Sequence, residues 1–190
     1  MRKLGLGVAA WLLLGLETGL RGTLQLWSPL TAPSLVLILA AFIAMCAPSR
    51  LAAWWAVGLG ILIDLTTPLP MTSASTPAVI LGPHALAYLL ASHLILSMRG
   101  VMIRRNPLTL GFLTLTGGLV AQATLLAMLW VRSWFDGIAF NAMAQLGERA
   151  AGAAYSAVVA VALAFVLLPA AEFLGLPSQT RARFGGHARA

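Results

Sequence analysis

A carboxylate, two imidazoles and a broken backbone come together in one stretch of this chain, residues 57–99. Asp64 ends an apolar segment, and a second apolar segment begins near Gly82 and contains His84 and His93. Asp64 and His84 are the only nearby acid–base pair in the sequence. The two histidines are nine residues apart, so they face roughly opposite sides of a continuous helix and cannot share a metal ion.

The rest of the chain offers little that catalysis needs, which is a nucleophile or a paired acid and base within reach of each other. The five carboxylates are spread one to a region, and there is no metal-ligand spacing, glycine-rich phosphate loop or nucleophile elbow. The single cysteine, Cys46, lies inside an apolar run and is expected to be a small core residue. We therefore expect a protein that is not an enzyme and uses no cofactor.

The composition is typical of an integral membrane protein. Of the 190 residues, 60% are hydrophobic and 9% are charged, whereas soluble proteins carry about 25% charged residues. The net charge of +7 is interpreted by position, as basic residues that mark the ends of membrane helices, and not as a surface for nucleic acid.

Six apolar segments predict membrane helices, each of which needs about 20 residues to cross the hydrocarbon core. They are expected at residues 4–20, 34–47, 51–66, 79–98 or 84–98, 107–130 and 150–171. The second is short and is expected to begin earlier, near Leu30, and the first is interpreted as an uncleaved membrane helix. Residues 136–148 are expected to form a separate short helix in the membrane interface.

The sequence thus predicts an all-α polytopic membrane bundle with six transmembrane helices. Residues 1–175 are expected to form one transmembrane domain, and residues 176–190 a flexible basic cytoplasmic tail. Basic residues concentrate on the cytoplasmic side of a membrane. With six spans, nine of them lie on the side of the termini and three on the other, so both termini are expected in the cytoplasm.

Several residues predict how the helices end and meet. Glu17 lies near the far end of the first segment, where a carboxylate can reach the lipid headgroups. Gly15 and Gly19 form a small pair suited to close helix contact. The last segment carries a stripe of small residues on one face, against which another helix can approach closely: Ala153, Ala157, Ala160 and Ala164. Three prolines exclude a regular helix from residues 67–78.

Residues 58–99 resemble the MreD family, rod-shape-determining membrane proteins of the bacterial cell-wall elongation machinery. That family has a glycine-spaced helix ending in Asp-Leu, a Pro-Leu turn, and a Leu-Gly-x-x-Ala-Leu-x-Tyr-Leu helix that ends in arginine. These pieces read here as Gly58-Leu59-Gly60, Asp64-Leu65, Pro68-Leu69, Leu81-Gly82-Pro83-His84-Ala85-Leu86-Ala87-Tyr88-Leu89 and Arg99. The resemblance extends with decreasing clarity over residues 30–125, and residues 71–80 are an insertion relative to the family pattern.

The resemblance implies a scaffold similar in fold to the S-components, the six-helix substrate-binding subunits of energy-coupling-factor transporters. It implies a place in the bacterial inner membrane and binding to MreC, a single-span protein whose bulk lies in the periplasm. Through MreC it implies a link to the MreB filament, a RodA-type peptidoglycan synthase and its transpeptidase. The residues it marks as partner-binding or structural are Asp64, Pro68, Gly82, His84, Tyr88 and Arg99.

Individual residues leave alternatives open. Asp64 is a solvated helix-end carboxylate, an aspartate that orders the broken turn or the partner site, or a group that couples to protons or ions. His84 and His93 are interpreted as core or interface histidines, and Tyr88 could pack on His84. Arg99, with its basic neighbours, is interpreted as a topology anchor that could also hold anionic lipid.

A substrate-binding subunit of a vitamin or small-molecule transporter is the alternative function. Against it, the sequence shows few polar residues that a bundle could bury around such a ligand.

Overall fold

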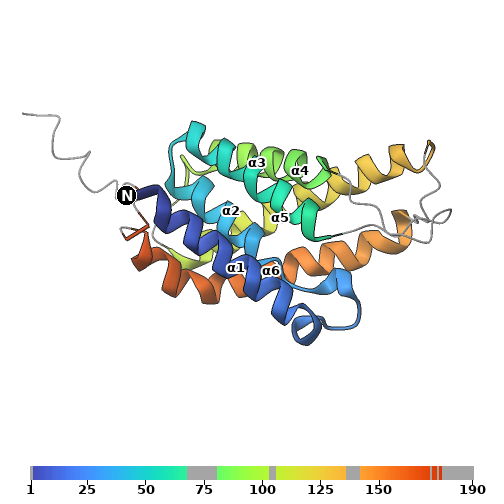
Figure 1. Cartoon of the computed structure of the whole chain (residues 1–190), viewed down its shortest axis with the longest axis horizontal. Helices are drawn as coiled ribbons and strands as arrows, with labels where there is room; N and C mark the ends of the chain where they lie inside the picture. The colour runs from blue at the N-terminus through green and yellow to red at the C-terminus, as the bar shows by residue number, and fades with distance from the viewer. Residues whose placement is uncertain are drawn as a thin grey trace, which may run out of the picture.

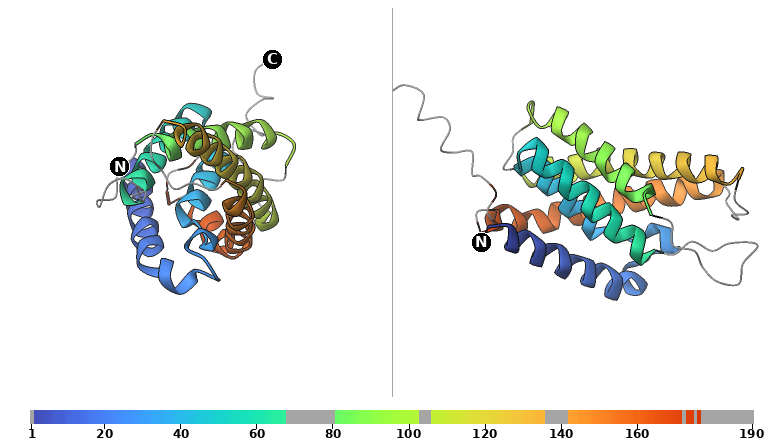
Figure 2. Two further views of the ribbon diagram at one scale, coloured as in Figure 1. Left: turned by 90° about the vertical axis from the view of Figure 1, so that its right-hand side faces the viewer. Right: turned by 45° about the horizontal axis from the view of Figure 1, so that its top comes forward.

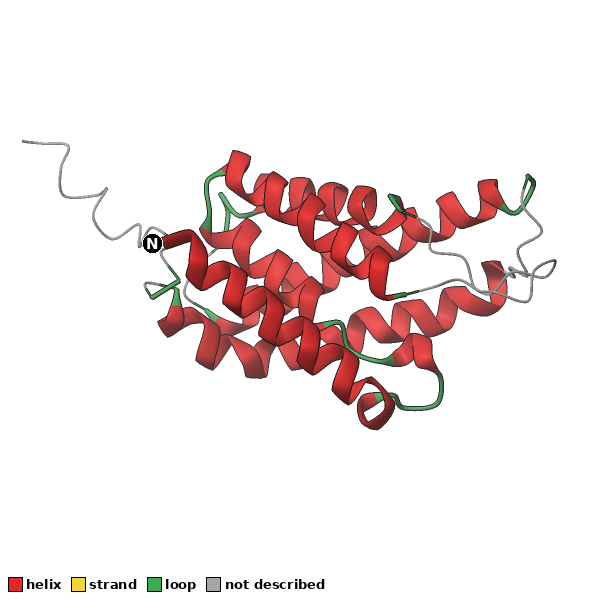
Figure 3. Ribbon diagram, in the orientation of Figure 1, coloured by secondary structure: helices red, strands yellow, loops and turns green. Residues whose placement is uncertain are grey.

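The computed structural model describes residues 2–67, 81–102, 106–135, 142–171, 173–174 and 176. These residues form six α-helices: α1 (Arg2–Leu24), α2 (Leu35–Cys46), α3 (Ser49–Thr66), α4 (Pro83–Met98), α5 (Pro107–Arg132) and α6 (Ala142–Ala170). A short 3-10 helix, η1 (Pro29–Thr31), precedes α2. The described part of the chain holds no strand (Figure 3), which confirms the predicted all-α class.

The helices lie along the long axis of the molecule and reverse direction from each one to the next (Figures 1 and 2). The start of α1, the turn between α2 and α3, and the end of α4 therefore gather at one end, called here the N-terminal end. The end of α3 and the starts of α2, α4 and α6 gather at the other end, called here the distal end.

The central helix is α2, which packs against each of the five other helices. Every residue from Leu35 to Met45 is buried, as expected for a helix that is apolar all round. It begins at Leu35 because Ser34 caps it, with the Ser34 hydroxyl oxygen accepting a hydrogen bond from the Leu37 N–H at 3.2 Å. The expected start near Leu30 is wrong, since Leu30 belongs to η1.

The last helix is longer than predicted. It begins at Ala142 and runs without a break to Ala170, because its first turns consist mainly of strong helix formers. The separate helix expected over residues 136–148 is therefore wrong from Ala142 onward, and residues 136–141 lie outside the described residues. Arg149, expected just before the last membrane segment, instead lies about two turns inside α6.

Small residues bring neighbouring helices close together. The stripe on α6 is buried as predicted, and a Cβ added at Gly118 of α5 would lie 3.3 Å from the Ala153 Cβ. On α3, a Cβ added at Gly60 would overlap the backbone of Ala85 on α4. This close approach between α3 and α4 occurs one turn before Asp64 and places that residue beside the start of α4.

Three helical segments are long and apolar enough to cross a membrane: Ser49–Thr66, Pro107–Arg132 and Gln145–Ala170. Large apolar side chains such as Trp11, Phe165 and Val166 stand exposed on the surface, which is typical of helix faces that meet lipid. The helical bundle is thus consistent with a membrane protein. Of the predicted tail, residues 176–190, the structure describes Leu176 alone, which is buried.

Candidate functional site

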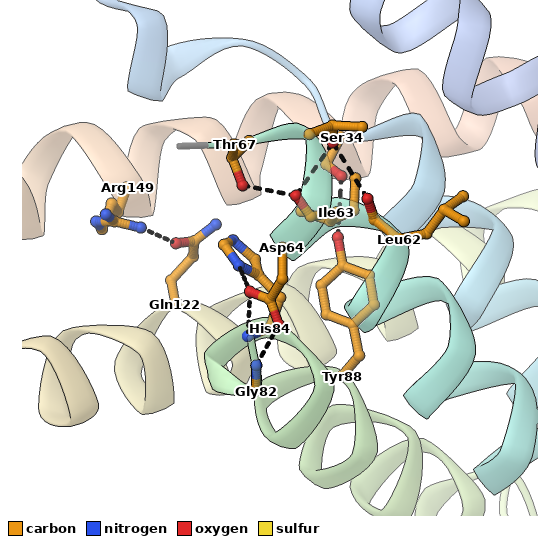
Figure 4. Close-up of polar contacts among 11 residues, drawn as sticks. Ser34, Leu62, Ile63, Asp64, Thr67, Gly82, His84, Tyr88, Gln122 and Arg149 are labelled. Carbon is orange, nitrogen blue, oxygen red and sulfur yellow. Dashed lines mark hydrogen bonds and ion pairs between the residues drawn. The ribbon is translucent and has the colours of Figure 1, made fainter. Parts of the chain in front are cut away.

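Asp64 holds the start of α4 through its carboxylate (Figure 4). Its Oδ2 accepts a hydrogen bond from the Gly82 N–H at 2.8 Å, and its Oδ1 accepts one from the His84 N–H at 3.1 Å. The His84 ring nitrogen Nδ1 lies 2.6 Å from the same Oδ1. An ionised carboxylate only accepts hydrogen bonds, so Nδ1 is the donor. Gly82 is the N-cap residue of α4, and glycine has no side chain that could accept a hydrogen bond. The Asp64 carboxylate therefore caps α4 in its place.

This geometry narrows the alternatives for Asp64. Its exposed fraction is 2%, so the interpretation as a solvated helix-end carboxylate is wrong. Its contacts are those of a residue that orders the break between α3 and α4. Gly82 is needed at this break because its φ of +119° lies in a region that side chains rarely adopt. Pro68, the other candidate in this turn, lies outside the described residues.

A second carboxylate, that of Glu17, caps the start of α2 in the same way. Glu17 of α1 accepts a hydrogen bond from the Val36 N–H at 2.8 Å through Oε2, and the Ser34 hydroxyl donates to its Oε1 at 3.2 Å. The expectation that Glu17 reaches toward lipid headgroups is wrong, because its side chain turns inward to the N-terminus of α2. Anionic groups are favoured there, since the first turn of a helix has free N–H groups.

Tyr88 connects the two caps. Its hydroxyl oxygen lies 3.2 Å from the Ser34 Oγ, and its ring meets the His84 ring edge to face, with centroids 6.3 Å apart. The predicted packing of Tyr88 on His84 is confirmed. The residue is 4% exposed, so this contact lies inside the bundle. His93 is exposed elsewhere on α4, which separates the two histidines as the spacing predicts. The interpretation of His93 as a core residue is therefore wrong.

Arg99 lies at the N-terminal end and not with the other candidates. Its guanidinium Nη1 donates to the carbonyl oxygens of Ala44, at 3.0 Å, and of Ala47. These carbonyls belong to the end of α2, where a cation is favoured by the helix dipole. Arg99 and Glu17 thus stabilise the two ends of the same buried helix. The neighbouring Arg104 and Arg105 lie outside the described residues.

The capped helix starts border a cavity of about 80 Å³ at the distal end. Its lining includes the polar side chains of Glu17, Arg21, Ser34, Thr67, His84, Tyr88, Gln122 and Arg149. A space of this size admits a few water molecules or one small polar group. Tyr88 is the buried member of this set, and the others are partly exposed.

Gln122 and Arg149 are the site residues that sequence reasoning missed. The Arg149 Nη1 donates to the Gln122 Oε1 at 2.9 Å, and its Nε and Nη2 donate to the Gln145 Oε1 at 3.2 and 3.1 Å. Figure 4 shows Gln122 and Arg149 on one side of the Asp64–His84 pair and Ser34 and Tyr88 on the other. The available signal was an amide side chain inside an apolar helix, because polar groups are rare in membrane segments and mark function there.

The polar contacts at the distal end join neighbouring helices to one another. Across the described ranges, His84 hydrogen-bonds to Asp64 and to no hydroxyl, thiol or amine that could act as a nucleophile. The same residues include no cluster of three or more metal-ligating side chains.

No protein-family model matches the chain, and neither curated proteins nor solved structures give a match. The likeness to MreD is therefore one of sequence pattern.

Proposed function

We propose that the protein is a non-catalytic membrane scaffold of the bacterial cell-wall elongation machinery, of the MreD type. In this proposal it spans the inner membrane six times, keeps both termini in the cytoplasm and has the S-component-like fold. It receives the transmembrane helix of a single-span, MreC-like partner on one helix face. Through that partner it contacts the MreB filament, the RodA-type synthase and its transpeptidase.

The six-span arrangement is supported by the alternating helix directions (Figure 2). Two helices are shorter than the hydrocarbon core of about 30 Å: the 16 residues of α4 extend over about 24 Å and the 12 residues of α2 over about 18 Å. The more difficult of the two is α2. Because α2 is buried among the other helices, it does not have to extend over the full thickness of the hydrocarbon core. The residues at its two ends face partner groups in the protein, Glu17 at one end and Arg99 at the other, and do not have to reach the membrane surface.

The observation that carries the scaffold proposal is an open small-residue face on α1. Val8, Trp11, Leu12, Gly15 and Gly19 share one face of the helix by their three- and four-residue spacing. The three large side chains are 57%, 73% and 58% exposed, and a Cβ added at either glycine would meet no atom within 4 Å. Figure 2 shows α1, in dark blue, at the edge of the bundle in both views.

Two glycines four residues apart allow another helix to approach the α1 backbone closely, which favours association in a membrane. Glu17 lies between them in the sequence and points the other way, to the start of α2. Its hydrogen bonds therefore hold α1 with the glycine face directed outward. The distal caps contribute to partner binding in this proposal by fixing that orientation.

The test is a pull-down from the protein's own cells in mild detergent, followed by mass spectrometry. The variant Gly15→Leu/Gly19→Leu fills the open face, and Gly58→Leu is the matched control, because Gly58 of α3 also has open space around its Cβ position. We expect the tagged protein and the control to recover a single-span protein with a large periplasmic domain, and the double variant to lose it. Equal recovery by all three would contradict the proposed face.

The distal cavity favours a second candidate, the substrate-binding subunit of a small-molecule transporter. The same pull-down separates the two functions. Recovery of a pair of ATPase subunits with a coupling membrane protein would support the transporter, and recovery of wall-synthesis proteins would support the scaffold.

A further inference from the structure

Arg149 is a partly buried cation whose described hydrogen-bond partners are both neutral amides. Its three hydrogen bonds end on the amide oxygens of Gln122 and Gln145. Among the residues that the structure describes, the one salt bridge joins His84 and Asp64. Arg149 thus has hydrogen-bond acceptors around it, and among the described residues no carboxylate is in ion-pair contact with it. The adjacent Glu148 acts on it only through space, and the Glu148 carboxylate accepts a hydrogen bond from the Ser28 hydroxyl at 2.8 Å.

The position of Arg149 makes this arrangement costly. The residue lies about two turns inside α6 and is partly buried. A guanidinium removed from water loses hydration energy that amide oxygens replace only in part, and an opposite charge is needed to replace the rest. The positive charge is therefore available to an anion that enters the cavity, which Arg149 lines.

The other charged residues that line the cavity do not pair with Arg149. Arg21 is a second cation on the wall, and Glu17 is the wall's carboxylate. Glu17 is already engaged by the Val36 N–H and the Ser34 hydroxyl. Asp64 is not part of the wall and is engaged at the start of α4. The wall residues Arg21, Arg149 and Glu17 therefore carry one more positive than negative charge, and Glu148, which is not on the wall, is engaged by Ser28.

The two glutamines fix how the guanidinium is presented. Gln145 binds Nε and Nη2, and Gln122 binds Nη1 from a different helix. An arginine held in this way is preorganised, because its side-chain freedom is already lost before a ligand binds. Its planar set of donors matches the two oxygens of a carboxylate or phosphate group.

We propose that the distal cavity binds a small oxyanion, a carboxylate or phosphate group, with Arg149 as its principal contact and Gln122 and Gln145 as positioning residues. The cavity of about 80 Å³ accommodates one such group. The group belongs either to a small solute or to the headgroup of an anionic lipid. This site is separate from the glycine face of α1 and does not depend on the scaffold function.

The experiment measures thermal unfolding of the purified full-length protein in phosphatidylcholine nanodiscs. One arm titrates inorganic phosphate or acetate against chloride at equal ionic strength. A second arm replaces part of the phosphatidylcholine with phosphatidylglycerol. A saturable rise of the unfolding temperature in the first arm identifies a solute site, and a rise in the second arm alone identifies a lipid headgroup.

Three variants test the residue assignment. Arg149→Gln removes the cation, and we expect at least about tenfold weaker binding of the stabilising anion, as for loss of a charged hydrogen-bond partner. Gln122→Glu places a carboxylate where an amide oxygen now lies 2.9 Å from the guanidinium. This variant should fold at least as well as the parent and lose the rise in unfolding temperature that the anion causes. It therefore tests the role of Arg149 even if Arg149→Gln does not fold. Arg50→Gln, at the N-terminal end, is the matched control and should keep the response.

Absence of stabilisation in both arms would overturn the proposal. So would a response that persists in Gln122→Glu, because the internal carboxylate would then not compete with the ligand for Arg149.

Discussion

The Tyr88 hydroxyl lies 3.2 Å from the Ser34 Oγ, and this contact joins two helix caps that come from separate parts of the chain. On one side, Glu17 and Ser34 cap α2. On the other, Asp64 caps α4, where the Tyr88 ring packs on His84. Because each cap joins the end of one helix to the start of another, the four helices α1 to α4 are fixed together at the distal end.

Removal of the Asp64 carboxylate should loosen the α3–α4 connection. Asp64→Ala leaves the N–H groups of Gly82 and His84 without their acceptor, at an expected cost of about 1–3 kcal/mol in the free energy of unfolding. Thermal unfolding in mild detergent would show this loss, while membrane insertion should be unchanged. The control is Thr66→Ala, on an exposed residue of the same helix end. Equal unfolding temperatures for the two variants would contradict the capping role.

Asp64→Ala is also expected to weaken partner recovery, as the resemblance implies. Since Asp64 is 2% exposed, this effect would act through displacement of α4 and not through direct contact. Partner recovery in proportion to the loss of stability would agree with that indirect route. Unchanged recovery from a clearly destabilised variant would separate Asp64 from partner binding.

The Tyr88–Ser34 contact should be measurable as a coupling. Tyr88→Phe keeps the ring on His84 and removes the hydroxyl, with an expected cost of about 0.5–1.5 kcal/mol. Ser34→Ala removes the other partner and also the hydrogen bond from the Leu37 N–H, while the Glu17 contact with the Val36 N–H remains. In a double-mutant cycle the two losses should sum to more than the loss of the double variant, because both single changes break the same bond. Strict additivity would mean that the contact contributes nothing to stability.

Gly60 should not tolerate a methyl group, although the neighbouring Gly58 should. A Cβ at Gly60 would overlap the backbone of Ala85, and backbone cannot turn aside as a side chain does. We expect Gly60→Ala to cost about 1–3 kcal/mol, in the range of overpacked cores. Gly58→Ala should be neutral or stabilising by about 0.5–1 kcal/mol, because alanine is the better helix former and the space is open. A comparison of unfolding temperatures checks the pair.

The helical class and several contacts followed from the sequence alone. Long apolar runs broken by Pro, Gly and charged residues define helices wherever the chain lies, because a helix satisfies its own backbone. The alanine stripe of α6 and the Tyr88–His84 contact were also predictable, since both follow from the spacing of residues on a single helix. The likeness of residues 58–99 to MreD, and the function inferred from it, likewise come from the order of motifs along the chain.

Contacts between helices were decided by the tertiary structure. Glu17 was expected at the lipid headgroups and instead caps α2. Arg149 was expected just before the last membrane segment and instead lies inside α6, where it hydrogen-bonds to Gln122 of α5. Arg99, grouped by sequence with Asp64, caps the far end of α2. Local spacing specifies which residues share a face of one helix. It leaves open the depth and rotation at which two distant helices meet, and those two quantities determine which polar groups find each other.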